Sequence, residues 1–237
     1  MIIHHHPSET IAQHTEQFII HELQAYLARG KSLLLLSGGS AGKEVAPLLT
    51  QRFSTIKHLN NLTIGLVDER FGPPGHADSN MLVIKESGLA EIVERNRGTV
   101  MWPLQSDSMT KDTVVKAYNS QITRRFGSCN GRTLGVFGIG EDGHTAGIKP
   151  LPKETFNSIF TDSPALVTGY RAKDYERITL TPLGINQITM AVIFAIGEKK
   201  QAVLEKLVGP TKCNEHEFPA GIFRKHKNVH VFTDQLV

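Results

Sequence analysis

An uninterrupted apolar run that leads into a glycine-rich turn constrains the fold of this 237-residue chain more than any other stretch. The run covers residues 134–139, and the turn after it holds Gly140, Asp142, Gly143 and His144. Short continuous apolar runs are typical of strands that are buried on both faces of a parallel sheet. Because glycine allows backbone angles that other residues avoid, the segment predicts a buried strand whose carboxyl end presents a carboxylate and an imidazole.

Three further apolar runs repeat this pattern along the chain. They occupy residues 33–36, 62–67 and 190–196, and each is followed by a turn of small or charged residues and then by a helical pattern. Strands that alternate with helices predict an α/β fold, with a mostly parallel sheet covered by helices on both faces. The length allows one large domain, so we predict a single Rossmann-like domain over residues 1–237 whose four turns meet at one edge.

The remaining elements follow from periodicity and from capping residues. Ser8 is placed to cap a helix over residues 8–29, which Gly30 can end, and the histidines at 4–6 are expected to lie on an irregular, solvated end. The other predicted helices cover residues 43–51, 110–126 (ending at Gly127) and 197–207, with a short one from Met81, and the other predicted strands cover 99–102, 165–169, 178–180 and 229–232.

Composition and charge exclude several classes of protein. The net charge of +3 is spread along the chain without a basic stripe, so nothing indicates binding to nucleic acid. The sequence has no run of about 18 apolar residues and no cationic segment before an apolar core, so we predict neither a membrane span nor a secretion signal. Two cysteines give no disulfide framework, which fits a reducing, cytoplasmic environment.

Two turns carry features of a phosphate site. Residues 37–42 form a Ser-Gly-Gly-Ser-Ala-Gly turn between a strand and a helix, where unpaired helix amides bind anions. Lys199 and Lys200 lie near the start of a predicted helix, where a positive charge opposes the helix dipole unless solvent or an anion lies nearby. The alternatives are a connection whose glycines only allow the bend, and a solvated pair of lysines.

Charged residues follow the strand at 62–67. Asp68, Glu69 and Arg70 are costly to bury unless they pair or contact a ligand. Ser79 or Asn80 can cap the short helix that comes next. These positions therefore predict either part of a binding site or a salt-bridged strand end.

The glycines at 138, 140 and 143 also spell the GxGxxG pattern of dinucleotide-binding turns. Such a turn opens a helix, but Pro150 and Pro152 arrive within ten residues of His144, and Asp142 would repel a pyrophosphate. We therefore disfavour a dinucleotide site. A tight turn with a surface histidine is the structural alternative.

Seven segments, taken together, point to a known family. They are LSGGS at 36–40, VDER at 67–70, DSN at 78–80, GIGEDGHTA at 138–146, RITLT at 177–181, GEKK at 197–200 and FPAGI at 218–222. In this order they resemble the 6-phosphogluconolactonases, within a larger group that includes the glucosamine-6-phosphate deaminases. The resemblance spans nearly the whole chain and implies the fold type of that group.

The resemblance implies a cytoplasmic enzyme of the pentose phosphate pathway that hydrolyses 6-phospho-D-glucono-1,5-lactone to 6-phospho-D-gluconate without a metal or organic cofactor. It implies that His144 is the general acid or base and that Asp142 and Asp68 shape the site. The substrate-binding residues that it implies are Gly38, Gly39, Ser40, Arg70, Asn80, Arg177 and Lys200, with Arg70 and Lys200 on the phosphate beside the Ser40 loop. The expected partner is a small phosphorylated sugar lactone rather than nucleic acid or a membrane, and the expected state is a monomer or small homo-oligomer.

Some positions separate the two branches of this group or depart from both. Arg70 stands where the deaminase pattern has a tyrosine, and Lys149 stands where it has a glutamate, so both favour the lactonase. Against the lactonase pattern, Ala41-Gly42 replace Thr-Pro, Thr133 replaces an aspartate, and residues 147–149 replace Ser-Leu-Phe. The first of these departures removes a hydroxyl that would contact the phosphate.

The mechanism that we expect uses one imidazole twice. His144 takes a proton from water as the water attacks the lactone carbonyl, and the imidazolium then protonates the ring oxygen as the ester bond opens. Asp142 or Asp68 would orient the ring and raise the pKa of His144. A deaminase or isomerase of an amino-sugar phosphate is one alternative. A sugar-phosphate sensor without turnover is another, although a DNA-binding segment is not evident in the sequence.

Overall fold

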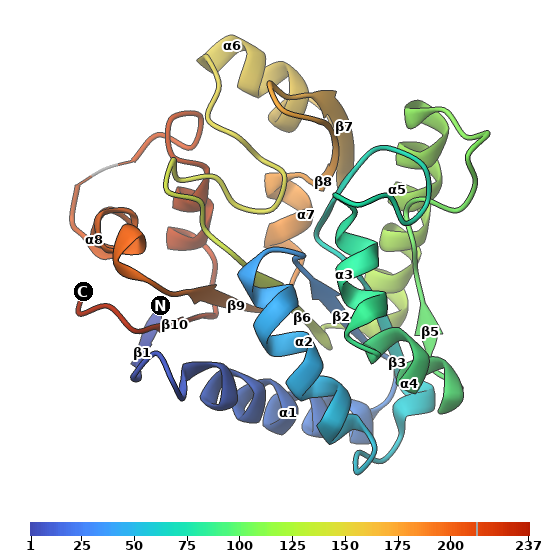
Figure 1. Ribbon diagram of the computed structural model, residues 1–237. Helices are drawn as coiled ribbons and strands as arrows, with labels where there is room; N and C mark the ends of the chain where they lie inside the picture. The colour runs from blue at the N-terminus through green and yellow to red at the C-terminus, as the bar shows by residue number, and fades with distance from the viewer. Residues whose placement is uncertain (212) are drawn as a thin grey trace.

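The structure, a computed structural model, describes residues 1–211 and 213–237 and contains one large sheet and one small sheet (Figure 1). All pairs of neighbouring strands in the seven-stranded sheet are parallel. The spatial order is β1 (Ile2–His5), β10 (Val229–Thr233), β9 (Met190–Ala195), β6 (Thr133–Phe137), β2 (Ser32–Leu36), β3 (Leu62–Leu66) and β5 (Thr99–Val100). The predicted mostly parallel α/β fold is therefore confirmed.

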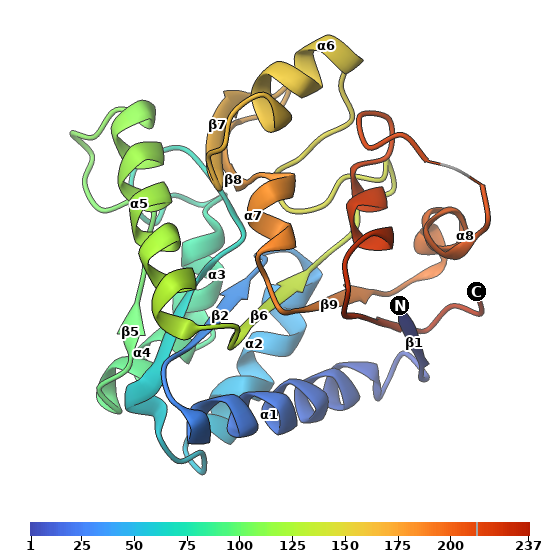
Figure 2. The same ribbon diagram turned by 180° about the vertical axis from the view of Figure 1, so that it is seen from behind.

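Helices cover both faces of the large sheet, which explains why β2, β3, β6 and β9 are mostly apolar and buried at every position. In β2, Leu34 and Leu36 face one hydrophobic core, whereas Leu33 and Leu35 face the other. The first core is closed by α1 (Ile11–Arg29), α2 (Ser40–Phe53), α3 (Asn80–Glu86) and α4 (Leu89–Arg95). The second is closed by α5 (Lys111–Cys129), α6 (Lys153–Phe156), α7 (Pro182–Asn186) and α8 (Gln201–Val208), and Figure 2 shows α5 and α7 in front of the sheet.

The small sheet is antiparallel and joins β4 (Asp68–Arg70), β8 (Glu176–Leu180) and β7 (Val167–Arg171). It packs beside α5, where the side-chain oxygen of Asn119 accepts hydrogen bonds from the amides of Leu166 and Val167. The interpretation of residues 68–70 as a turn was wrong, because they pair with a strand more than 100 residues later in the chain. A three-residue polar segment carries no periodicity that could have predicted this pairing.

The N-terminal end is also ordered. Residues 2–5 form β1, which pairs with β10 at the edge of the large sheet, so the expected irregular end was wrong. His4 lies within this pairing, with its Nε2 atom 2.9 Å from Nδ1 of His230. A four-residue edge strand is too short to give a pattern in the sequence.

Helix boundaries differ from the predictions by a few residues. Ser8 does not cap α1, because its hydroxyl donates to the carboxylate of Asp234. Helix α2 begins at Ser40, three residues early, and the short α4 was not predicted. Helix α5 continues through Gly127 to Cys129, and Asn130 at its C-cap adopts a left-handed φ of 45°. Within residues 1–211 and 213–237, no helix has both the length and the apolar character that crossing a membrane requires.

Candidate active site

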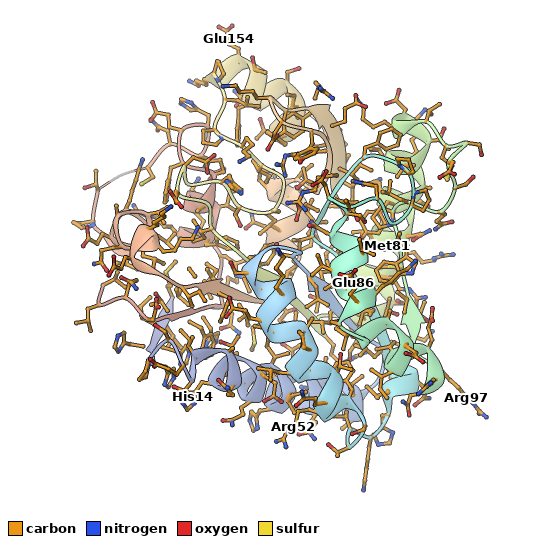
Figure 3. All side chains as sticks on the ribbon, in the orientation of Figure 1. His14, Arg52, Met81, Glu86, Arg97 and Glu154 are labelled. Carbon is orange, nitrogen blue, oxygen red and sulfur yellow. The ribbon has the colours of Figure 1, made fainter. Side chains whose placement is uncertain are left out.

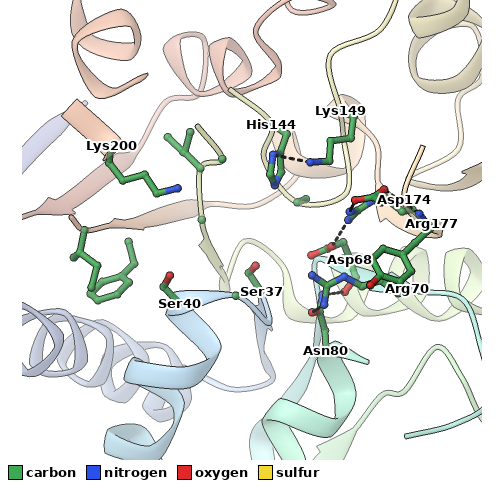
Figure 4. A pocket seen from close by; sticks show the side chains of 18 residues that line it. Ser37, Ser40, Asp68, Arg70, Asn80, His144, Lys149, Asp174, Arg177 and Lys200 are labelled. Atoms are coloured by element: carbon green, nitrogen blue, oxygen red, sulfur yellow. Dashed lines mark hydrogen bonds and ion pairs between the residues drawn. The ribbon is translucent and has the colours of Figure 1, made fainter. Parts of the chain in front are cut away.

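A cavity of about 340 Å³ lies at the carboxyl ends of β2, β3, β6 and β9, as expected for an open α/β sheet (Figure 4). The predicted site residues that line it are Gly39, Ser40, Asp68, Arg70, Asn80, His144, Arg177 and Lys200. The other two lie just outside its wall. Gly38 packs so tightly against Asn80 that a Cβ there would lie 1.9 Å from the Asn80 side-chain oxygen, and Asp142 lies beside His144. The structure therefore brings the three predicted turns and the segment at 68–70, which is β4, together around one space.

The turn after β6 holds His144 through its own backbone. The amide of Gly140 donates to the carbonyl of His144 over 2.8 Å, and the amide of Gly143 donates back to Gly140 over 2.9 Å. Gly143 has a φ of 82°, and a Cβ there would lie 2.4 Å from the ring of Phe218. A Cβ on Gly140 would lie 2.0 Å from Nδ1 of His144. Both glycines are therefore needed for the turn to seat the imidazole.

Asp142 orients the His144 ring. Its Oδ1 atom lies 2.5 Å from Nδ1 of the ring and also accepts the backbone amide of His144 over 3.1 Å. A carboxylate only accepts hydrogen bonds, so we assign the proton to Nδ1, which leaves the lone pair of a neutral ring on Nε2. Figure 4 shows His144 pointing into the cavity. The arrangement presents an oriented base to whatever the cavity holds.

Lys149 completes this cluster, and it is a residue that the sequence did not indicate as part of the site. Its ammonium lies 3.1 Å from Nδ1 of His144 (Figure 4). It also lies 3.3 Å from Oδ2 of Asp142. The sequence signal was the substitution at residues 147–149, which showed that the position is unusual but not where the side chain points.

The pKa values of this cluster differ from the expectation. Burial lowers the pKa of His144, and although Asp142 acts to raise it, the charges of Lys149 and Arg177 act with burial. The predicted rise was therefore wrong, because the prediction counted the carboxylate and not the desolvation or the two cations. Burial disfavours the charge of Asp142, but its hydrogen bonds with His144 and the charge of Lys149 bring its pKa to about 2. A neutral imidazole beside a charged carboxylate is the form suited to a general base.

A second charged cluster is buried on the small sheet. Arg177 is 4% exposed and donates to Asp174 over 2.7 Å, and it lies 3.8 Å from Oδ2 of Asp68. Burial raises the pKa of Asp68, opposed by the charges of Arg70 and Arg177. Asp174 was not predicted, because nothing in its local sequence indicates that it pairs with a site residue. Asp68 and Asp142 therefore play different parts, since only Asp142 contacts the His144 ring.

Arg70 is held from the start of α3. Its guanidinium donates to the side-chain oxygen of Asn80 over 2.5 Å and to the carbonyl of Asp78 over 2.9 Å. Glu69 lies behind them and accepts from the hydroxyl of Ser79 and the amide of Asn80, so it anchors α3 rather than a cation. Among the residues described, the Nε atom of Arg70 is buried and lacks a hydrogen-bond partner. The segment therefore combines structural support with a cation at the cavity.

Ser40 and Lys200 line another side of the cavity from Arg70 (Figure 4). Ser40 is the first residue of α2, and Gly39 at its N-cap offers no side chain to cap the helix. Lys200 ends the short 3-10 turn Glu198–Lys200 before α8. Free helix amides beside a cation favour an anion. Over residues 1–211 and 213–237, no group of three or more acidic, histidine or cysteine side chains is placed to hold a metal ion.

Known proteins resemble this chain over most of its length. The 6-phosphogluconolactonase of Xylella fastidiosa is 30% identical over 84% of this chain and 79% of its own length. Two solved structures share the fold: the 6-phosphogluconolactonase of Shewanella baltica (TM-score 0.78, 22% identity, 98% of this chain and 97% of that one) and that of Plasmodium vivax (TM-score 0.81, 17% identity, 98% and 90%). The family described as glucosamine-6-phosphate isomerases/6-phosphogluconolactonase matches residues 6–232. The chain belongs to that family.

Proposed function

We propose that this protein is a 6-phosphogluconolactonase, which hydrolyses 6-phospho-D-glucono-1,5-lactone to 6-phospho-D-gluconate. The observation that carries the proposal is a largely buried imidazole, oriented by Asp142 and pointing into a cavity that is also lined by Arg70, Arg177 and Lys200. The names of the relatives support the same reaction. The pathway, the cytoplasmic location and the oligomeric state stay predictions.

The reaction needs a base and then an acid at nearly the same place. In the proposed mechanism, Nε2 of His144 takes a proton from water while the water oxygen bonds to the lactone carbonyl carbon. The tetrahedral intermediate collapses by breaking the bond to the ring oxygen, which receives the proton from the imidazolium. The products are a hydroxyl group and a carboxylic acid that loses its proton to solvent. Asp142 keeps the ring in the required tautomer throughout.

The cations account for substrate binding in this proposal. We assign the phosphate to Arg70 and Lys200 together with the amides at the start of α2, because a dianion is attracted by both charge and free N–H groups. Arg177 and Asn80 then shape the wall and hold Arg70 and Asp68 in place. Ala41 offers no hydroxyl to the phosphate, so the amides carry that contact alone.

The test is an assay of the purified protein with freshly made 6-phosphogluconolactone. We expect acid release well above the spontaneous hydrolysis, which is measured in parallel and subtracted. Release of ammonia from glucosamine 6-phosphate would instead indicate a deaminase. A ligand that raises the melting temperature while no substrate is consumed would indicate a sensor, and either result would contradict the proposal.

A further inference from the structure

We infer that Lys149 is a positioning residue that fixes the Asp142 carboxylate against His144 and keeps the imidazole uncharged until it accepts a proton from the reaction. This inference rests on the proposed function, since it concerns the base of that reaction. The proposed mechanism gives no role to the contact between Lys149 and Asp142. The Lys149 ammonium lies 3.3 Å from Oδ2 of Asp142, while the other carboxylate oxygen binds His144.

The backbone at Lys149 and at the two residues before it is fixed by hydrogen bonds, so the fold places the Lys149 side chain beside His144. Its own amide donates to the hydroxyl of Tyr170 over 3.3 Å, and that hydroxyl donates to the carbonyl of Gly147 over 2.7 Å. Ile148 is fully buried in the core and its amide donates to Thr145. The Lys149 side chain itself is only 23% exposed.

The contact between Lys149 and the ring is a charge contact rather than a hydrogen bond. Nδ1 of His144 donates to Asp142, so it has no lone pair left for the ammonium that lies 3.1 Å away. A neutral ring tolerates a cation at this distance, whereas an imidazolium is repelled by it. Lys149 therefore counteracts Asp142: the carboxylate stabilises the imidazolium form of His144, and the ammonium destabilises it.

The other charged groups near His144 act in both directions. Arg177, from β8, also disfavours the imidazolium, whereas Asp68, from β4, favours it and Asp174 partly neutralises Arg177. Burial adds to the effect of the cations, and the pKa of His144 lies below its ordinary value. Among these groups Lys149 is the cation in direct contact with the ring and with its carboxylate partner.

The experiment compares three variants with the unmodified protein. Lys149→Met keeps the length of the side chain without its charge, Lys149→Arg keeps the charge, and Lys153→Met removes an exposed lysine from the nearby α6 as a control. For each we would measure kcat and KM across pH, and the titration of His144 by NMR in the free protein. The signal of His144 is identified by its loss in His144→Gln.

We expect Lys149→Met to raise the pKa of His144 and to move the acid limb of kcat/KM upward by about one pH unit. Well below that limb, kcat/KM then falls about tenfold, because a base must be uncharged to act, and KM stays within about twofold. Lys149→Arg should keep the acid limb of kcat/KM at the pH found for the unmodified protein, and Lys153→Met should not shift it.

Two outcomes would overturn the inference. One is a His144 titration that Lys149→Met leaves unchanged, and the other is a rise in KM with the acid limb in place, which would make Lys149 a substrate-binding residue. The NMR titration needs no turnover. If the unmodified protein lacks lactonase activity but Lys149→Met raises the pKa of His144, the proposed function fails while the assignment of Lys149 stands.

Discussion

The two charged clusters of the cavity are built in different ways. The His144 cluster is local, since Asp142 and Lys149 come from the same segment within seven residues of each other, and the side chains of the cluster are partly exposed. The Arg177 cluster joins β4 to β8, which are more than 100 residues apart in the chain, and both Arg177 and Asp68 are buried. The first cluster is therefore suited to change its charge during a reaction, and the second to hold the wall of the site.

Gly140→Ala should have a large effect on the His144 cluster, because the new methyl group would lie 2.0 Å from Nδ1 of His144 and clash with the ring. The ring can turn away, so we expect the melting temperature to change by a few degrees at most. The loss of alignment should lower kcat/KM about a hundredfold. Steady-state kinetics and thermal unfolding measure the two effects.

Gly127→Ala is the matched control, because Gly127 is exposed in α5 and its Cβ would meet open space. In Gly127→Ala, kcat and KM should not change. The free energy of unfolding should rise by about 0.5–1 kcal/mol, because alanine is a better helix former than glycine. A Gly140→Ala protein that is as active as Gly127→Ala would contradict the role given to the turn.

Arg177→Met addresses the buried cluster and should act first on stability. Removing the guanidinium leaves the Asp68 carboxyl buried without its partner. We expect a loss of about 2 kcal/mol in the free energy of unfolding, or roughly thirtyfold in the unfolding equilibrium. Urea denaturation measures this change. A variant that is as stable as the unmodified protein but inactive would contradict the structural role given to the Arg177 cluster.

Lys200→Met tests the side of the cavity near Ser40, where the Lys200 ammonium and the start of α2 form the proposed phosphate site. The loss of one charge from the proposed phosphate site should raise KM about tenfold, with kcat changed by less. Stability should not change, because the Lys200 side chain is partly exposed rather than buried. A variant with lower kcat and unchanged KM would place Lys200 outside the phosphate site.

The contrast between the clusters also explains what the sequence could predict. The strand and turn around His144 were predicted correctly, because an apolar run and nearby glycines are local features. The parallel sheet followed from four such runs. Two strands of the small sheet were predicted at 165–169 and 178–180 and are observed as β7 and β8. The pairing of β4 with β8 and the partnership of Arg177 with Asp174 and Asp68 could not be predicted, because a three-residue strand carries no period and its partners lie far away in the chain.

The pKa of His144 also depends on features that the local sequence does not show. Asp142 was visible two residues before His144 and led to the expectation of a raised pKa. Burial and the position of Lys149 depend on how the loop after the turn folds back, which no spacing in the sequence gives. The contact between Asp142 and His144 was predicted, because the two residues are close in the chain. The direction of the pKa shift of His144 was not, because burial lowers it.

The most direct test of the central claim is the rate of lactone hydrolysis by His144→Gln, which keeps a polar side chain of similar size but cannot take a proton. The account predicts a fall in kcat of about a hundred- to ten-thousandfold after subtraction of spontaneous hydrolysis, with the melting temperature nearly unchanged. A His144→Gln protein that retains nearly full activity would contradict it.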